Sequence, residues 1–431
     1  MTPAARLSAA IEVLDAIETQ RRPAAEALKD WGQRHRFAGA KDRAGIASLV
    51  YDALRVKRSA AWIMGAETPR AVALGMLSRV RHMDAEAIAT LCSGERFAPE
   101  PLTEDERGRL AAPSLEGAPD AVRADLPNWL APQLAEVFGA DLVSEGEALA
   151  ARAPVDLRAN LLVTTRERAL AALDHLGPEP TTLSPWGLRV PVTPDGRGPA
   201  LQAEPAYVKG QVEVQDEGSQ LAALLSGAAP GQQVLDLCAG GGGKTLALAA
   251  MMANKGQLYA TDSDGRRLMP IFDRLERAGV RNVQVRAPKG QQDILADLEG
   301  RCDLVLVDAP CTGTGTWRRN PDAKWRTRPG ALEQRMKEQD EVLERASRFV
   351  KPGGALVYIT CSLLRAENED RVAAFLERHE TFLPRDAAHM AKTAGVPSLA
   401  ERASPFGVGL RLTPRTCGTD GFYMAALVRG A

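Results

Sequence analysis

The sequence predicts an α/β protein in which an all-helical N-terminal region and a small α+β connector precede a parallel sheet covered by helices. Three observations predict this arrangement. Residues 1–112 carry apolar side chains at helical spacing, residues 157–192 mix short strand and helix patterns, and residues 231–360 alternate strand and helix regularly. Regular alternation is typical of a parallel sheet, because each crossover lays a helix on one face of the sheet.

The length of the chain indicates more than one domain. From its 431 residues we expect a helical domain over 1–145, a connector over 146–205 and a third domain over 206–431. A hydrophobic content of 45% with 25% charged residues is typical of a globular protein. The first 22 residues alternate apolar and charged side chains, which does not resemble a signal peptide, and no apolar run reaches the length of a bilayer span. We therefore expect a cytoplasmic monomer without membrane association.

The cysteines and the net charge exclude some classes of protein. The six cysteines are scattered and form no C-x-x-C pair, which argues against a disulfide framework and a zinc site, so no metal is expected. The net charge of −1 does not indicate nucleic-acid binding over the whole molecule. Residues 1–60 nevertheless contain more basic than acidic side chains. This excess fits either solvated helix faces or a surface that contacts phosphates.

The helical region begins with two amphipathic patterns. Apolar residues recur on one face over residues 7–17 and again over residues 46–54. Residues 97–132 are rich in proline, glycine and charge and read as a connection, followed by a helix over 129–139 that ends at a glycine. The connector is then predicted as a strand over 157–163, a helix over 166–176 and a strand over 186–192.

The regular part of the chain supplies the main sheet. Strands are predicted over 234–238, 257–261, 283–286, 304–307 and 355–360, and helices over 245–253, 265–278 and 329–349. The fourth strand is a continuous apolar run, as expected for a strand buried on both faces. Pro310 cannot extend a strand ladder, so this strand delivers Asp308 and Cys311 to its carboxyl end. The fifth strand delivers Cys361 in the same way, and ligands bind at such strand ends.

A glycine-rich turn follows the first strand of this sheet. The stretch Asp236-Leu-Cys-Ala-Gly-Gly-Gly-Gly-Lys-Thr245 opens a helix and lets a ligand approach the backbone closely. A P-loop of an NTPase also ends in Gly-Lys-Thr, but its first glycine is replaced here by Cys238. The other fitting ligand is S-adenosylmethionine. Asp262, at the end of the second strand, is then placed to bind a ribose diol or to cap the next helix.

The motifs together resemble the RNA (cytosine-5) methyltransferases of the Nop/Sun family. Beyond the glycine turn, the matching pieces are Val214–Gln220, Asp308–Cys311, Gly313–Arg319, Asn320–Trp325, Thr360–Ser362, Glu367-Asn368 and Asp420–Met424. The resemblance covers residues 208–431 and implies a Rossmann-like class I methyltransferase sheet that uses S-adenosylmethionine. More weakly, Asp42–Ala44 and Leu49–Arg55 resemble the NusB-like helical RNA-binding domain that bacterial members carry.

The resemblance also implies roles for single residues. Cys361 is the nucleophile, Cys311 assists proton removal or release of the RNA adduct, and Asp308 contacts the pyrimidine edge. Apart from the resemblance, a thiol needs nearby positive charge to ionise at neutral pH, and we expect Lys244 and the arginines near Trp317 to contribute it. The cofactor-binding residues expected from the resemblance are Cys238, Ala239, Gly240, Gly241, Gly242, Gly243, Lys244, Asp262, Arg267 and Asp308. The implied partner is RNA, with rRNA of the small ribosomal subunit as the expected substrate and tRNA as an alternative.

The chemistry of methyl transfer to carbon 5 of cytosine explains why two cysteines are useful. Carbon 5 of cytosine becomes nucleophilic only after a thiolate adds to carbon 6, and the later loss of the carbon-5 proton needs a base. In the DNA-type scheme the thiolate is that of a Pro-Cys pair, here Pro310-Cys311, and a second cysteine has no role. We also expect RNA contacts from Trp317–Arg319 and Lys324–Arg326, which interleave aromatic and basic side chains.

One departure from the family pattern leaves a non-catalytic alternative open. The family has an acidic residue just after the third strand, but this chain reads Arg286-Ala-Pro-Lys-Gly290 there, and Asp293 comes a few residues late. An RNA-binding or ribosome-assembly factor on the same fold would tolerate this loss.

Overall fold

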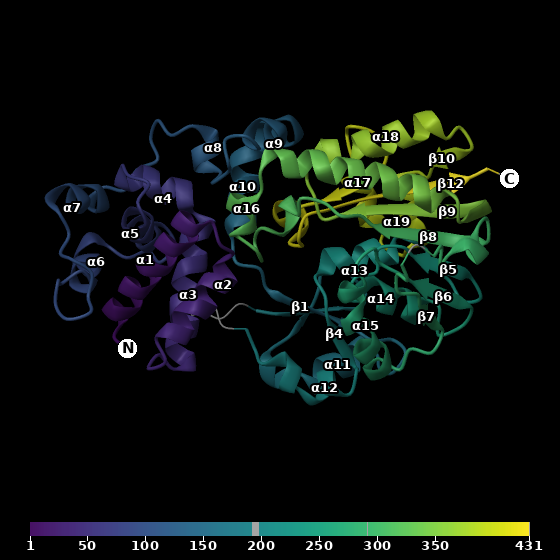
Figure 1. Cartoon of the computed structure of the whole chain (residues 1–431), viewed down its shortest axis with the longest axis horizontal. Coiled ribbons are helices and arrows are strands. Elements are labelled where there is room, and N and C mark those ends of the chain that lie inside the picture. Colours follow the sequence, from purple (N-terminus) through teal and green to yellow (C-terminus); the bar gives the residue numbers. More distant parts are fainter. Residues whose placement is uncertain (192–197, 291, 431) are drawn as a thin grey trace. The chain divides into compact units, whose positions relative to one another are not determined.

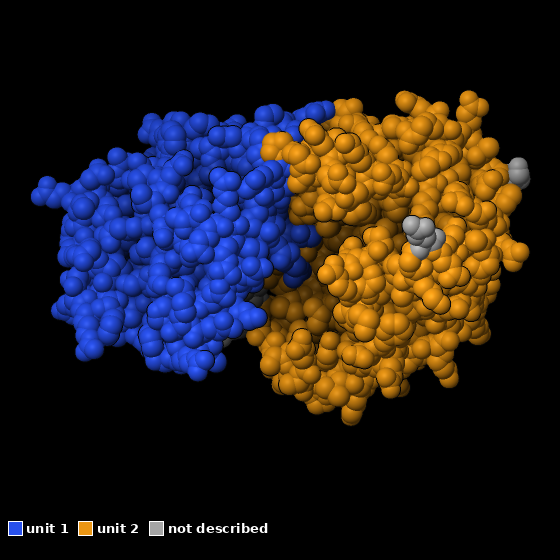
Figure 2. All heavy atoms as spheres, in the orientation of Figure 1, with its two compact units in different colours: residues 1–152, 193–197, 316–328 blue, residues 153–192, 198–315, 329–431 orange. Residues whose placement is uncertain are grey.

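The computed structural model describes residues 1–191, 198–290 and 292–430, and Val192, the last residue of one predicted strand, lies outside them. The chain forms two compact units, shown in separate colours in Figure 2. The first unit, hereafter the helical unit, contains residues 1–152 together with the distant segment 316–328. The second, hereafter the sheet unit, contains the described residues of 153–315 and 329–430. The described residues contain no helix that is both long and apolar enough to cross a membrane.

The helical unit is built around the first long helices. Buried side chains at the predicted spacing, among them Leu7, Leu14, Ile46 and Val50, form one continuous core. The main helices of the unit are α1 (Pro3–Gln20), α2 (Ala24–Arg34), α3 (Ala40–Arg55), α4 (Lys57–Met64), α5 (Pro69–Arg79), α6 (Ala85–Leu91), α7 (Glu104–Ala111), α8 (Asp120–Arg123), α9 (Ala131–Phe138) and α10 (Leu142–Ala150).

Segment 316–328 follows the loop of Cys311 in sequence but packs within the helical unit. The Trp325 indole donates to the Leu54 carbonyl at 2.7 Å, and the Lys324 ammonium donates to the Arg55 carbonyl at 3.2 Å. Trp317 and Lys324 are each only 1% exposed. The prediction that Trp317 and Lys324 contact RNA is therefore wrong for this structure, because both side chains are buried and Lys324 anchors the segment instead.

A four-stranded antiparallel sheet forms the connector within the sheet unit. Its order is β2-β3-β1-β4, with β1 (Val155–Ala159), β2 (Glu179–Pro180), β3 (Gly187–Val190) and β4 (Val212–Val214). Helices α11 (Arg166–Ala172) and α12 (Pro205–Val208) accompany it. Since β4 pairs with β1, this small sheet continues beyond residue 205.

The large sheet contains the five predicted parallel strands, visible on the right of Figure 1. They are β5 (Gln233–Asp236), β6 (Gln257–Ala260), β7 (Val283–Val285), β8 (Cys302–Asp308) and β9 (Val350–Thr360), in the full order β10-β12-β9-β8-β5-β6-β7. One edge differs from the predicted parallel sheet, because β12 (Phe422–Arg429) inserts antiparallel between β9 and β10 (Phe382–Pro384). Strand β11 (Leu410–Leu412) pairs with β12.

Helices cover both faces of the large sheet, as predicted. One buried cluster joins the sheet to α13 (Glu217–Leu224), α14 (Gly243–Met251) and α19 (Ala387–Thr393). The other joins it to α17 (Pro329–Ser347) and α18 (Glu369–Arg378). Helix α15 (Gly265–Arg277) packs through Ile271 and Leu275 beside β6. The Rossmann-like fold class predicted from the sequence is confirmed.

Candidate active site

Two cysteines meet at the carboxyl edge of the large sheet. Strands β8 and β9 pair in parallel with Asp308 opposite Ile359, so the loops that follow them start at the same edge. The Sγ atoms of Cys311 and Cys361 lie 3.3 Å apart, within hydrogen-bonding distance for thiols. The two predicted strand-end cysteines are thus neighbours in space, although 50 residues separate them in the sequence.

The contact between the thiols changes the acidity of Cys311. The hydrogen bond with Cys361 and burial together raise the pKa of Cys311 well above its usual value. A thiol with a raised pKa keeps its proton at neutral pH, and either sulfur of this close pair can donate to the other. The arrangement therefore places two thiols within reach of the same reacting group.

An ion pair lies beside the cysteine loops. The Lys244 ammonium, from the first turn of α14, lies 2.7 Å from the Asp308 carboxylate. The Lys244 side chain is 8% exposed and also lies 5.3 Å from the ring centroid of Phe422. The positive charge of Lys244 therefore acts first on Asp308. The arginines around Trp317, which the sequence suggested as a second source of charge, belong to the helical unit.

The segment after β5 borders a hollow through Leu237 and Cys238, and the glycine turn follows directly. The Gly240 amide donates to the Asp262 carboxylate at 3.0 Å, and Arg267 lies 3.5 Å from the other oxygen of Asp262. Gly242 has φ +84°, and a Cβ there would lie 2.5 Å from Ile271, so only glycine fits. The hollow has a volume of about 380 Å³ and is lined, among others, by Cys238, Asp262, Arg267, Pro310 and Val342.

The hollow is lined by some of the predicted cofactor-binding residues and by others that were not predicted. Cys238, Asp262 and Arg267 border the hollow, whereas Lys244 and Asp308 form their ion pair outside its lining. Side chains of α17 complete the wall: Arg335, Glu338, Glu341, Val342 and Arg345. Sequence reasoning missed this wall, because nothing in an amphipathic helix pattern tells which strand end the helix covers.

Comparison with known proteins identifies the family. Residues 223–428 match the family model described as 16S rRNA methyltransferase RsmB/F. Ribosomal RNA small subunit methyltransferase B of Shewanella oneidensis is 30% identical over 316 residues, 73% of this chain and 69% of that protein. The chain belongs to this RsmB/F family. The relationship to the Nop/Sun methyltransferases that the motifs indicated is thereby confirmed.

Two further similarities extend the comparison. The probable ribosomal RNA small subunit methyltransferase B of Synechocystis is 34% identical over 260 residues, 59% of this chain and 57% of that protein. The chain therefore spans less than two thirds of that relative's length. The solved structure of PH0851 aligns over 99% of both chains with a TM-score of 0.70 at 24% identity, which shows a common fold.

The cofactor of this RsmB/F family member is S-adenosylmethionine. Residues of the glycine turn and of the hollow fit this cofactor. The buried Asp236 carboxylate accepts from the Thr245 hydroxyl at 2.7 Å, while its other oxygen, Oδ1, has no hydrogen-bond donor among the described residues. An orphaned buried acceptor beside a glycine cradle suits the α-ammonium group of the cofactor. Asp262 at the hollow suits the ribose hydroxyls.

Asp236→Asn is expected to stabilise the cofactor-free protein above pH 7. Burial raises the pKa of Asp236 from 3.8 to about 7. Between these values the folded protein keeps a proton that the unfolded chain releases, so its stability falls as pH rises through this window. Asparagine removes this penalty, a gain of at most roughly 4 kcal/mol above pH 7. Urea unfolding at pH 4 and pH 8 measures the free energy of unfolding of the wild type and of Asp236→Asn. If the difference between the two proteins is the same at both pH values, the expectation is contradicted.

The segment after β7, the third predicted strand, lacks the acidic residue of the family pattern, and other side chains occupy this place. Arg286 forms an ion pair with Asp297, and its guanidinium lies 4.4 Å from the ring centroid of Tyr259. Asp293 accepts from the Leu295 amide at 3.1 Å and does not line the hollow described above. Asp293 therefore lies outside the lining of this hollow, and an arginine–aromatic stack occupies the end of β7.

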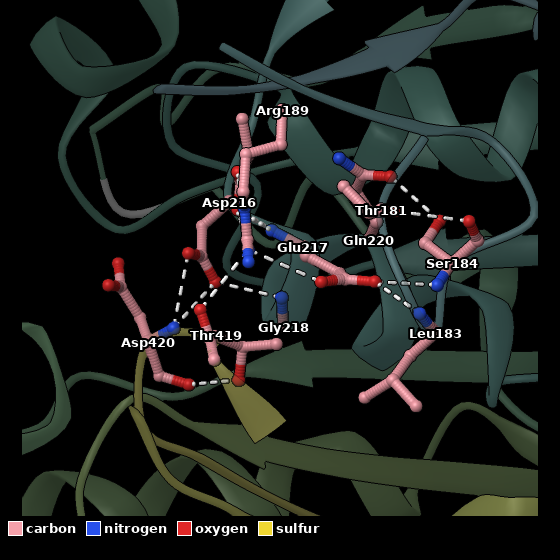
Figure 3. Close-up of polar contacts among 12 residues, drawn as sticks. Thr181, Leu183, Ser184, Arg189, Asp216, Glu217, Gly218, Gln220, Thr419 and Asp420 are labelled. Carbon is pink, nitrogen blue, oxygen red and sulfur yellow. Dashed lines mark hydrogen bonds and ion pairs between the residues drawn. The ribbon is translucent and has the colours of Figure 1, made fainter. Parts of the chain in front are cut away.

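The Val214–Gln220 motif joins three parts of the sheet unit (Figure 3). The buried Glu217 carboxylate accepts from the Leu183 and Ser184 amides at 2.7 and 2.8 Å, which fixes the loop before β3. Asp216 caps α13 through the Gly218 amide and also accepts from the Asp420 amide at 3.1 Å. The motif therefore fixes the start of β12, whose Phe422 lies against Lys244.

Proposed function

We propose that this protein methylates carbon 5 of cytosine in RNA, using S-adenosylmethionine and a covalent cysteine–pyrimidine adduct. The observation that carries the proposal is the 3.3 Å contact between Cys311 and Cys361 at the strand ends that also bear Asp308. The relatives named as small-subunit rRNA methyltransferases favour rRNA of the small ribosomal subunit as the substrate. The helical unit, which we take as NusB-like, would then contact RNA, in a protein acting as a cytoplasmic monomer.

Cys361 acts as the nucleophile in this proposal. Its thiolate adds to carbon 6 of cytosine, and the electron pair of the carbon 5–carbon 6 double bond moves to carbon 5. When bound, S-adenosylmethionine supplies an electrophilic methyl group. Asp308 contacts the N3 edge of the pyrimidine, and its ion pair with Lys244 holds the carboxylate in place.

Cys311 completes the reaction. After carbon 5 carries the methyl group, its proton must leave before the ring double bond can reform. A base, for which solvent is available at an open site, takes that proton; the electron pair of the broken C–H bond restores the double bond and expels the Cys361 thiolate, so that the protein and the methylated RNA separate. Cys311, in contact with the departing sulfur, is placed to assist the release of the Cys361 thiolate. The target cytosine must be unpaired or flipped, because carbon 6 is inaccessible in a stacked helix.

The test is methyl transfer to defined RNA. The protein is incubated with small-subunit rRNA, tRNA and the matching DNA in the presence of S-adenosylmethionine, and digested nucleosides are analysed by mass spectrometry. The expected product is 5-methylcytidine in rRNA. Product only in tRNA would move the substrate to the alternative, and binding of RNA without any methylated nucleoside would favour a non-catalytic assembly factor.

A further inference from the structure

A buried carboxylate outside the proposed chemistry links the two cysteine loops. Glu367 lies between β9 and α18 and is 0% exposed. One oxygen accepts from the Thr312 amide at 2.8 Å and from the Gln339 amide group at 3.0 Å. The other accepts from the hydroxyls of Thr312 and Ser362. One side chain thus contacts the residue that follows each cysteine.

Further contacts make this connection rigid. Gln339, on α17, also donates to the Pro310 carbonyl at 2.8 Å, directly before Cys311. The Tyr358 hydroxyl, on β9, donates to the Glu367 backbone carbonyl at 2.7 Å. Because a carboxylate only accepts, it can satisfy all these donors at once, whereas a neutral amide would turn a donor of its own toward one of them.

We propose that Glu367 is a positioning residue that holds Cys311 and Cys361 in contact by fixing the backbone on either side of the active site. It touches neither sulfur and acts through Thr312 and Ser362. The proposal deepens the proposed function and rests on it for its consequence in catalysis. The positioning itself is a property of the protein without RNA, and so it can be measured separately.

A trivalent arsenical measures the contact directly. Phenylarsine oxide condenses with two neighbouring thiols, forming two As–S bonds and releasing one water without any change of oxidation state. The wild-type protein should bind it through Cys311 and Cys361, and Cys311→Ala and Cys361→Ala should each lose this capture. Glu367→Gln should bind it roughly tenfold more weakly, the effect expected for loss of a charged hydrogen-bond acceptor.

Glu369→Gln is the matched control. Glu369 is also buried, at 3% exposure, but its carboxylate binds Arg411 and Ser404, neither of which adjoins a cysteine. This variant should lose stability yet capture the arsenical like the wild type. Glu367→Asp keeps the charge with a shorter reach and should fall between wild type and Glu367→Gln, so it provides the test if the glutamine variant does not fold.

Single-turnover kinetics connect the positioning to the reaction. Glu367→Gln should lower the rate of methyl transfer by about tenfold or more while leaving the dissociation constant of S-adenosylmethionine unchanged. The proposal would be overturned if folded Glu367→Gln bound phenylarsine oxide as tightly as the wild type does. It would also be overturned if Glu367→Gln and Glu369→Gln lost the same amount of affinity for it. Capture by a wild-type protein that methylates no RNA would instead refute the proposed function and leave the positioning role standing.

Discussion

Cys311→Ala should accumulate an RNA–protein adduct that survives denaturation, whereas Cys361→Ala should form none. In the proposed mechanism the thiolate of Cys361 makes the bond to carbon 6, and Cys311, whose pKa is raised by its contact with Cys361, serves the step that breaks this bond. Removing the releasing group stalls the reaction after the bond has formed. Each variant is incubated with RNA and S-adenosylmethionine and analysed on a denaturing gel.

Turnover should fall by roughly three orders of magnitude or more in both variants, because each removes a group that the covalent route requires. The control is the double variant Cys311→Ala/Cys361→Ala, which should form no adduct. Cys92→Ala, at a buried cysteine of the helical unit, should behave like the wild type. An adduct in Cys361→Ala and none in Cys311→Ala would contradict the assignment and favour the DNA-type scheme at Pro310-Cys311.

Lys244→Met should lower the rate of methyl transfer by about a hundredfold to a thousandfold, because an oriented charge in an active site contributes that much. Lys244 lies 2.7 Å from Asp308, and methionine keeps much of its shape without its charge. The carboxylate that we assign to the pyrimidine edge would then lose its fixed position. Single-turnover kinetics with saturating cofactor measure the loss of rate. Calorimetry of S-adenosylmethionine binding shows whether the variant also binds the cofactor more weakly.

Lys255→Met provides the control for a lost lysine charge. Lys255 is exposed in the turn before β6, and its substitution should change neither rate nor cofactor binding. A rate for Lys244→Met close to that of Lys255→Met would show that the Lys244–Asp308 pair has only a structural role.

Features that depend on neighbouring residues were predictable from the sequence. The apolar run into Asp308, the proline that ends it and the glycine turn at Gly242 are each encoded locally. Parallel pairing then brings the strand ends together without further information. For this reason the Cys311–Cys361 neighbourhood and the fold class followed from pattern and resemblance.

Features set by distant contacts were not predictable. The antiparallel insertion of β12 depends on pairing with β9, more than 60 residues earlier in the sequence. Trp317 and Lys324 look like RNA-binding side chains in sequence, but both are buried, and Lys324 donates to the carbonyl of Arg55, far earlier in the chain. Glu367 belonged to a recognised motif, yet only its contacts with Thr312, Ser362 and Gln339 indicate what it does.

The most direct test of the central claim is to map the cysteine that bonds to RNA in the wild-type protein. RNA containing 5-fluorocytidine is used with S-adenosylmethionine, because the fluorine on carbon 5 cannot leave as a proton and the adduct persists. Proteolysis and tandem mass spectrometry then locate the modified residue. We predict a methylated nucleotide on Cys361 alone. A nucleotide on Cys311 would contradict the account, as would methylated cytosine in unmodified RNA with no adduct on either cysteine.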